Sequence, residues 1–82
     1  MEVEKMTKIK YCVAHLDANL QGVNVTYYAY QKGQYGLYLV NDLKDENVIW
    51  YDLEEQAKKH ILNTNECVIS ILEEYIPKFN TK

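Results

Sequence analysis

The sequence of 82 residues contains no arginine, because all nine of its basic residues are lysines. Arginine supplies the planar group that grips phosphate and guanine edges. The chain also has twelve acidic residues and a formal net charge of −3. Proteins that bind nucleic acid usually present a strongly basic surface. Direct nucleic-acid binding is therefore disfavoured.

Cysteine, proline and glycine are also scarce, with two, one and three residues. Small disulfide-stabilised domains usually carry four or more cysteines, so Cys12 and Cys67 predict free thiols and a cytoplasmic location. Gly22, Gly33 and Gly36 match no phosphate-binding loop. No apolar run approaches the roughly 20 residues of a membrane span, and the N-terminus lacks the apolar core of a signal peptide. We expect no membrane association.

Hydrophobic residues make up 48% of the chain, which indicates a folded protein. This length supports one domain with one modest core. We therefore expect residues 1–82 to form a single domain. Residues 1–6 and 77–82 are predicted to fray, because chain ends without an apolar pattern are seldom held in place.

The hydrophobic pattern predicts an α+β fold: a single antiparallel β-sheet of about four to five strands with one α-helix on one face. The segment 66–75 fits either a strand or a helix, and its β-branched residues favour a strand. The predicted order is β-β-β-β-α-β, with strands at residues 7–16, 23–31, 34–41 and 48–51, a helix after Asp52, and a last strand within 66–75.

The second and third predicted strands form a hairpin around Lys32 and Gly33, where glycine allows the turn. This register places Ala29 opposite Gly36, which makes a shallow spot for the helix. The helix is predicted to be capped by Asp52, with Glu55 three residues later as in a capping box.

The opposite face of this hairpin is rich in tyrosine, and the predicted elements leave nothing to cover it. Exposed apolar patches mark interaction surfaces, and tyrosine is enriched at interface cores. Tyrosine is also simply a favoured strand residue, and both explanations stay open. We expect a partner, or a second copy in a homodimer, to bind the tyrosine face and the acidic loop beside it: Tyr28, Tyr30, Tyr35, Leu37, Asp42, Asp45 and Glu46.

The tyrosine face could instead stack nucleobases on a nucleic-acid- or nucleotide-binding sheet. Such sheets combine aromatic residues with a positive groove. Lys32 is the only basic residue within residues 26–39. This alternative is the weaker one.

Four residues could in principle bind zinc, namely Cys12, His15, His60 and Cys67. On a strand, however, Cys12 and His15 point to opposite faces. The same residues make no better Cys–His nucleophile pair, and His15 beside Asp17 lacks a nucleophile. We therefore expect no metal, no cofactor and no enzymatic activity.

The layout of residues 8–75 resembles small orphan proteins of phages and mobile elements of low-GC Gram-positive bacteria. The likeness is carried by YYAYQKGQYGLYLVNDLKDENVIWYDLEEQAKKHI, residues 27–61. Such proteins are often accessory factors, and some act stoichiometrically against host defence systems, as anti-CRISPR proteins do. The resemblance implies a cytoplasmic, non-catalytic inhibitor that binds a host defence or nucleic-acid-handling protein. The alternative is a homo-oligomeric accessory protein.

Overall fold

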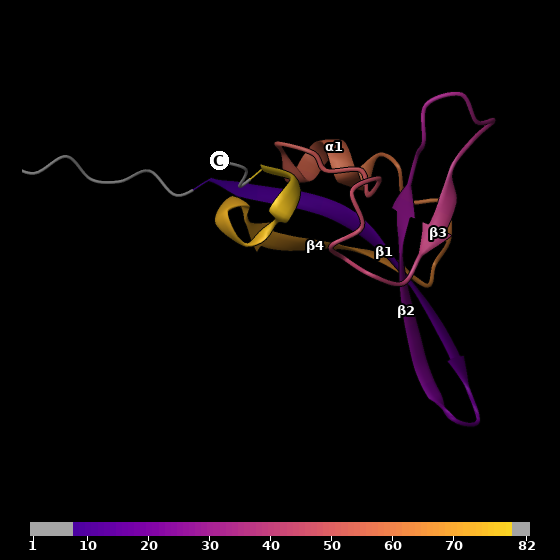
Figure 1. Cartoon of the computed structure of the whole chain (residues 1–82). Coiled ribbons are helices and arrows are strands. Elements are labelled where there is room, and N and C mark those ends of the chain that lie inside the picture. Colours follow the sequence, from indigo (N-terminus) through magenta and orange to yellow (C-terminus); the bar gives the residue numbers. More distant parts are fainter. Residues whose placement is uncertain (1–7, 80–82) are drawn as a thin grey trace, which may run out of the picture.

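The computed structural model describes residues 8–79, and it contains one antiparallel four-stranded sheet with a single α-helix (Figure 1). The predicted fold class is confirmed. The strand order in the sheet is β3-β2-β1-β4. The elements are β1 (Ile9–Asn19), β2 (Gly22–Ala29), β3 (Tyr38–Val40), α1 (Glu54–Lys58), β4 (Glu66–Leu72) and the 3₁₀ helices η1 (Glu73–Tyr75) and η2 (Pro77–Phe79).

The core is built around β1, which pairs with β2 on one side and with β4 on the other. Cys12, Val13 and Ala14 follow one another along β1, and all three are buried. Successive side chains of a strand point to opposite faces, so both faces of β1 are covered at this level. The helix α1 packs against β1 and β4 and buries Ala57.

Strands β1 and β2 separate at one end, and the segment 47–51 lies between them. Their pairing stops at Ala14↔Tyr27. Beyond that point Val48 bridges to Ala29 in β2, and Tyr51 bridges to Tyr11 in β1. The predicted strand at residues 48–51 is therefore wrong as a full strand. Instead, its two backbone bridges connect this segment to β1 and to β2 where the two strands diverge.

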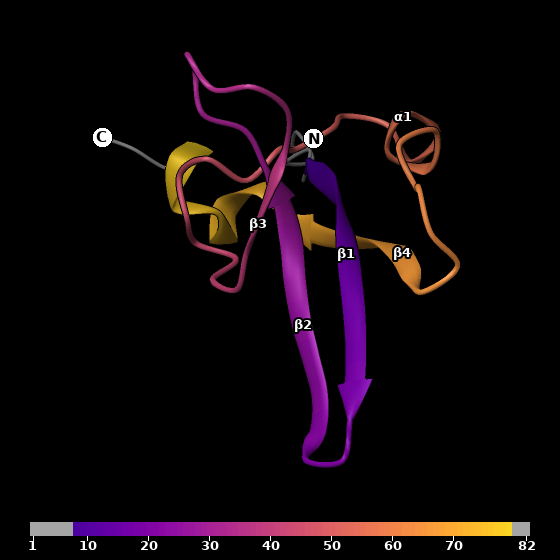
Figure 2. The ribbon, with the colours of Figure 1, turned by 90° about the vertical axis from the view of Figure 1, so that its right-hand side faces the viewer.

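At their other end, β1 and β2 continue as a two-stranded arm, residues 16–25, which projects from the body (Figures 1 and 2). Pairing with β4 ends at His15↔Glu66, and pairing with β3 ends at Tyr27↔Val40. Among residues 8–79, no third strand therefore pairs with the arm. Leu20 at its tip is completely exposed, with a relative accessibility of 105%.

The predicted register of the second hairpin is wrong by two residues. Ala29 pairs with Tyr38, not with Gly36, and residues 30–37 form a loop. The alternation of faces is kept because the shift is an even number, and Ala29 is buried as expected. Gly36 lies in the loop at φ +72°, with nothing within 4 Å of the position of an added Cβ. Gly36 therefore does not provide a surface on which the helix packs.

The predicted helix cap is also wrong. Asp52 pairs with Lys10 on β1 instead. The residue before α1 is Leu53, whose backbone N–H donates to the Gln56 side chain at 3.3 Å. The helix is short and ends at Lys58.

The preference for a strand at the C-terminal end is confirmed, since β4 covers Glu66–Leu72 before the chain turns into η1. Residues 77–79, which were predicted to fray, form η2. The rest of that prediction, for residues 1–6 and 80–82, lies outside the described residues. None of the helices that the structure describes has the length and apolar character needed to cross a bilayer.

Candidate functional site

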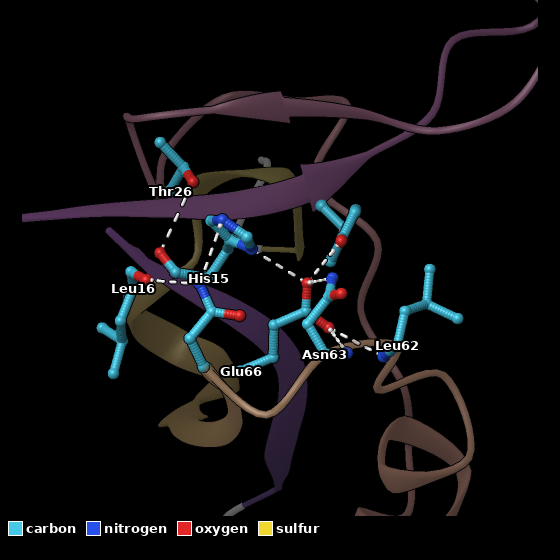
Figure 3. Close-up of polar contacts among 8 residues, drawn as sticks. His15, Leu16, Thr26, Leu62, Asn63 and Glu66 are labelled. Atoms are coloured by element: carbon cyan, nitrogen blue, oxygen red, sulfur yellow. Dashed lines mark hydrogen bonds and ion pairs between the residues drawn. The ribbon is translucent and has the colours of Figure 1, made fainter. Parts of the chain in front are cut away.

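A buried carboxylate, Glu66, organises the polar interior beside β1. It opens β4 directly opposite His15 of β1, and its side chain is fully inaccessible. Glu66 and His15 share one face of the sheet with Thr26 and Tyr28 of β2, because the registers of both strand pairs align them. Figure 3 shows His15, Asn63 and Leu62 arranged around this carboxylate.

Five hydrogen bonds satisfy the two oxygens of Glu66. Oε2 accepts from the Tyr28 hydroxyl at 2.5 Å, from His15 Nδ1 at 2.9 Å and from the Asn63 amide at 3.0 Å. Oε1 accepts from the backbone N–H of Leu62 at 2.7 Å and of Asn63 at 3.1 Å. We call Glu66, His15, Tyr28 and Asn63 the Glu66 cluster. It joins three strands and the turn that precedes β4.

The hydrogen bonds keep Glu66 ionised. Burial by itself raises the pKa of this carboxyl, but the donors from Tyr28, Asn63, His15 and the Leu62 backbone outweigh burial and lower the pKa to about 2. In turn, the pKa of the Tyr28 hydroxyl is raised, chiefly because it is hydrogen-bonded to Glu66. A carboxylate held in this way is a structural anion and a poor general base at neutral pH.

The imidazole of His15 is engaged at both nitrogens. Nδ1 faces Glu66, and Nε2 lies 3.4 Å from the amide nitrogen of Asn65. Cys12 and Cys67 lie on the other face of the sheet, since Cys67 pairs with Ala14 rather than with His15. Neither thiol can therefore act with this histidine, and burial raises the pKa of Cys12 to about 12.

The predicted partner-binding residues lie in three places: the Glu66 cluster, the loop 30–37 and the acidic turn after β3. Tyr28 belongs to the Glu66 cluster and is partly buried. Tyr30, Tyr35 and Leu37 belong to the loop 30–37, which we call the tyrosine loop, and all three are exposed. The sequence therefore grouped side chains that the structure separates.

The predicted acidic residues lie at the opposite end of β3 from the tyrosine loop (Figure 1). Asp42 accepts the backbone N–H of Lys44, and Asp45 accepts that of Asn47. Both carboxylates thus shape the turn, as aspartates commonly do. Glu46 is exposed.

Residues 8–79 hold no group of three or more histidine, cysteine or acidic side chains placed to bind a metal ion. His60, one of the four residues considered as zinc ligands, stacks on Tyr51 with ring centroids 5.0 Å apart. Its Nδ1 lies 2.9 Å from the carbonyl oxygen of Gln56.

In comparisons with known proteins, no family model, no curated protein and no solved structure matched this chain.

Proposed function

We propose that this protein is a non-catalytic protein-binding domain that contacts its partner through the tyrosine loop. One observation carries the proposal. Tyr35 is completely exposed, at 104% relative accessibility, and Tyr30 and Leu37 of the same loop are each more than two-fifths exposed. Clustered large hydrophobic side chains on a surface are typical of interaction sites.

The chemistry of the loop suits a protein partner. Tyrosine offers a large contact area with only two rotatable side-chain bonds. Glycine makes the backbone adaptable, and amide side chains supply adaptable hydrogen bonds. The tyrosine loop combines these types, with two tyrosines, two glycines and two glutamines, and Lys32 is its only charged residue. A partner with an apolar groove edged by hydrogen-bonding groups would match it.

More specifically, we propose that the protein is a phage-type stoichiometric inhibitor of a host defence or nucleic-acid-handling protein. The support for this more specific proposal is the resemblance of layout together with the net charge of −3. The exposed Glu46 and the rest of the acidic turn, at the far end of β3, could approach a basic region of such a partner.

Affinity capture from a low-GC Gram-positive bacterial lysate tests the proposal. Wild type is compared with a variant carrying Tyr30→Ser and Tyr35→Ser. Tyr75→Ser serves as the matched control, because Tyr75 is 66% exposed but lies in η1. We expect wild type and the control to retain one host protein in stoichiometric amount.

The loop variant should lose that protein while its circular dichroism spectrum and unfolding curve stay unchanged. Capture of the same protein by the loop variant would contradict the proposal. So would the absence of any stoichiometric partner.

A further inference from the structure

The two-stranded arm, residues 16–25, has one apolar and one polar face. Leu16 pairs with Val25, and Ala18 pairs with Val23, so these four side chains share a face. The pair between these two, Asp17 with Asn24, lies on the other face. This alternation is the pattern of a strand pair that packs on one side.

The apolar face of the arm is largely open to solvent. Val23 is 63% exposed and Leu16 is 37% exposed, and Leu20, in the turn at the tip, is exposed completely. An isolated two-stranded hairpin is marginally stable in water at best. A contact that covers the apolar face would therefore stabilise the arm.

Along the outer edges of the arm, beyond Leu16, no strand among residues 8–79 pairs with the backbone groups. Leu16 directs its N–H and C=O away from β2, to Asn65, at 2.9 and 2.7 Å. By alternation along the paired strands, Ala18 on β1 and Val23 and Val25 on β2 direct their backbone groups outward as well. β4 and β3 do not reach these positions.

We propose that two copies of this chain associate by packing the apolar faces of their arms together about a two-fold axis. A two-fold contact uses one surface twice, so an apolar face meets an identical apolar face. Asp17 is the only charged residue among residues 16–25, and it lies on the polar face. The arms can therefore meet without like-charge repulsion, although the whole chain carries a charge of −3.

The placement of the arm also leaves room for a second copy. The arm projects away from the helix and from the tyrosine loop, so two arms can lie along each other while the two bodies stay apart (Figure 2). A stable interface usually takes about 20–30 residues from each partner, and the arm offers far fewer. The dimer should consequently be weak and form reversibly with concentration.

Sedimentation equilibrium of the full chain over a wide concentration series tests the dimer. Wild type should shift from the mass of one chain toward that of two. The variant Leu20→Gln with Val23→Thr should remain a single chain at every concentration. Asn24→Thr, which alters only the polar face, should behave as wild type.

Should the double variant lose its cooperative unfolding, Val23→Thr alone replaces it, since threonine keeps the shape and strand preference of valine. This single variant should weaken the dimer at least severalfold. A wild type that stays a single chain at its highest soluble concentration would overturn the proposal. A dimer that tolerates the arm variants would overturn it too.

The tyrosine-loop variant separates this inference from the proposed function. Tyr30→Ser with Tyr35→Ser should leave the dimer intact, because the tyrosine loop and the arm extend in different directions from the body (Figure 1). Loss of the dimer in that variant would assign self-association to the tyrosine loop and overturn the arm contact.

Discussion

The Glu66 cluster and the tyrosine loop use the same residue type in opposite ways. Tyr28 donates its hydroxyl to a fully buried carboxylate, whereas Tyr35, seven residues later, is completely exposed. The difference follows from whether the tyrosine lies in a strand that is paired with its neighbours. Tyr28 is still held between neighbouring strands, but β2 ends at Ala29 and the chain then leaves the sheet. A tyrosine inside the sheet becomes part of the structure, and one beyond it stays exposed to solvent.

The two regions also differ in how they handle polarity. The Glu66 cluster collects five donors on one carboxylate, and each would be costly to leave unpaired in the interior. In the tyrosine loop, Gln34 N–H donates to the Gln31 carbonyl at 3.1 Å, and Tyr30 N–H donates to the Asn47 carbonyl at 2.9 Å. The first region should govern stability, and the second should affect it little.

The largest expected effect comes from removing the carboxylate. Glu66→Ala leaves the Leu62 and Asn63 backbone donors without a partner, and we expect the free energy of unfolding to fall by about 3 kcal/mol. Glu46→Ala, at an exposed acidic residue, should change it by less than about 0.5 kcal/mol. Urea unfolding of both variants measures the difference, and equal effects would contradict a structural role for Glu66.

Acid should remove the same stabilisation in wild type. The pKa of Glu66 is about 2 in the folded protein, against 4.5 for an ordinary glutamate. Because the folded pKa is the lower one, the contribution is complete above pH 4.5 and is lost as the pH falls toward 2. It amounts to at most about 3 kcal/mol. Glu66→Gln should show a flatter loss over this interval, and identical acid profiles would show that other groups dominate.

The sequence was sufficient for the fold class, because alternation of apolar residues survives errors in register, although residues 48–51 were wrongly predicted as a full strand. Ala29 was assigned to the core face of the hairpin, and a strand at Glu66–Leu72 was favoured by its β-branched residues. The register of the second hairpin was not predicted correctly, because glycines at 33 and 36 both permit positive φ and either can end a turn. Local turn chemistry therefore left the loop length open.

The Glu66 cluster was missed for a different reason. Its members come from residues 15, 28, 63 and 66, and only the pairing of β1 with β2 and β4 brings them together. One signal was present. Glu66 begins a strand rich in β-branched residues and lies on the same face of that strand as Val68 and Ser70. Its charge is therefore expected on that face of the sheet. Which strand lies beside it is a long-range property that this pattern does not encode.

Tyr28 is structural and Tyr35 is not, and two matched substitutions distinguish these two roles. Tyr28→Phe removes one hydroxyl from the Glu66 cluster, and Tyr35→Phe removes one from the tyrosine loop. We expect Tyr28→Phe to lower the free energy of urea unfolding by about 1–2 kcal/mol, and Tyr35→Phe to change it by less than about 0.5 kcal/mol. Equal losses, or a larger loss at Tyr35, would contradict this division of the tyrosines.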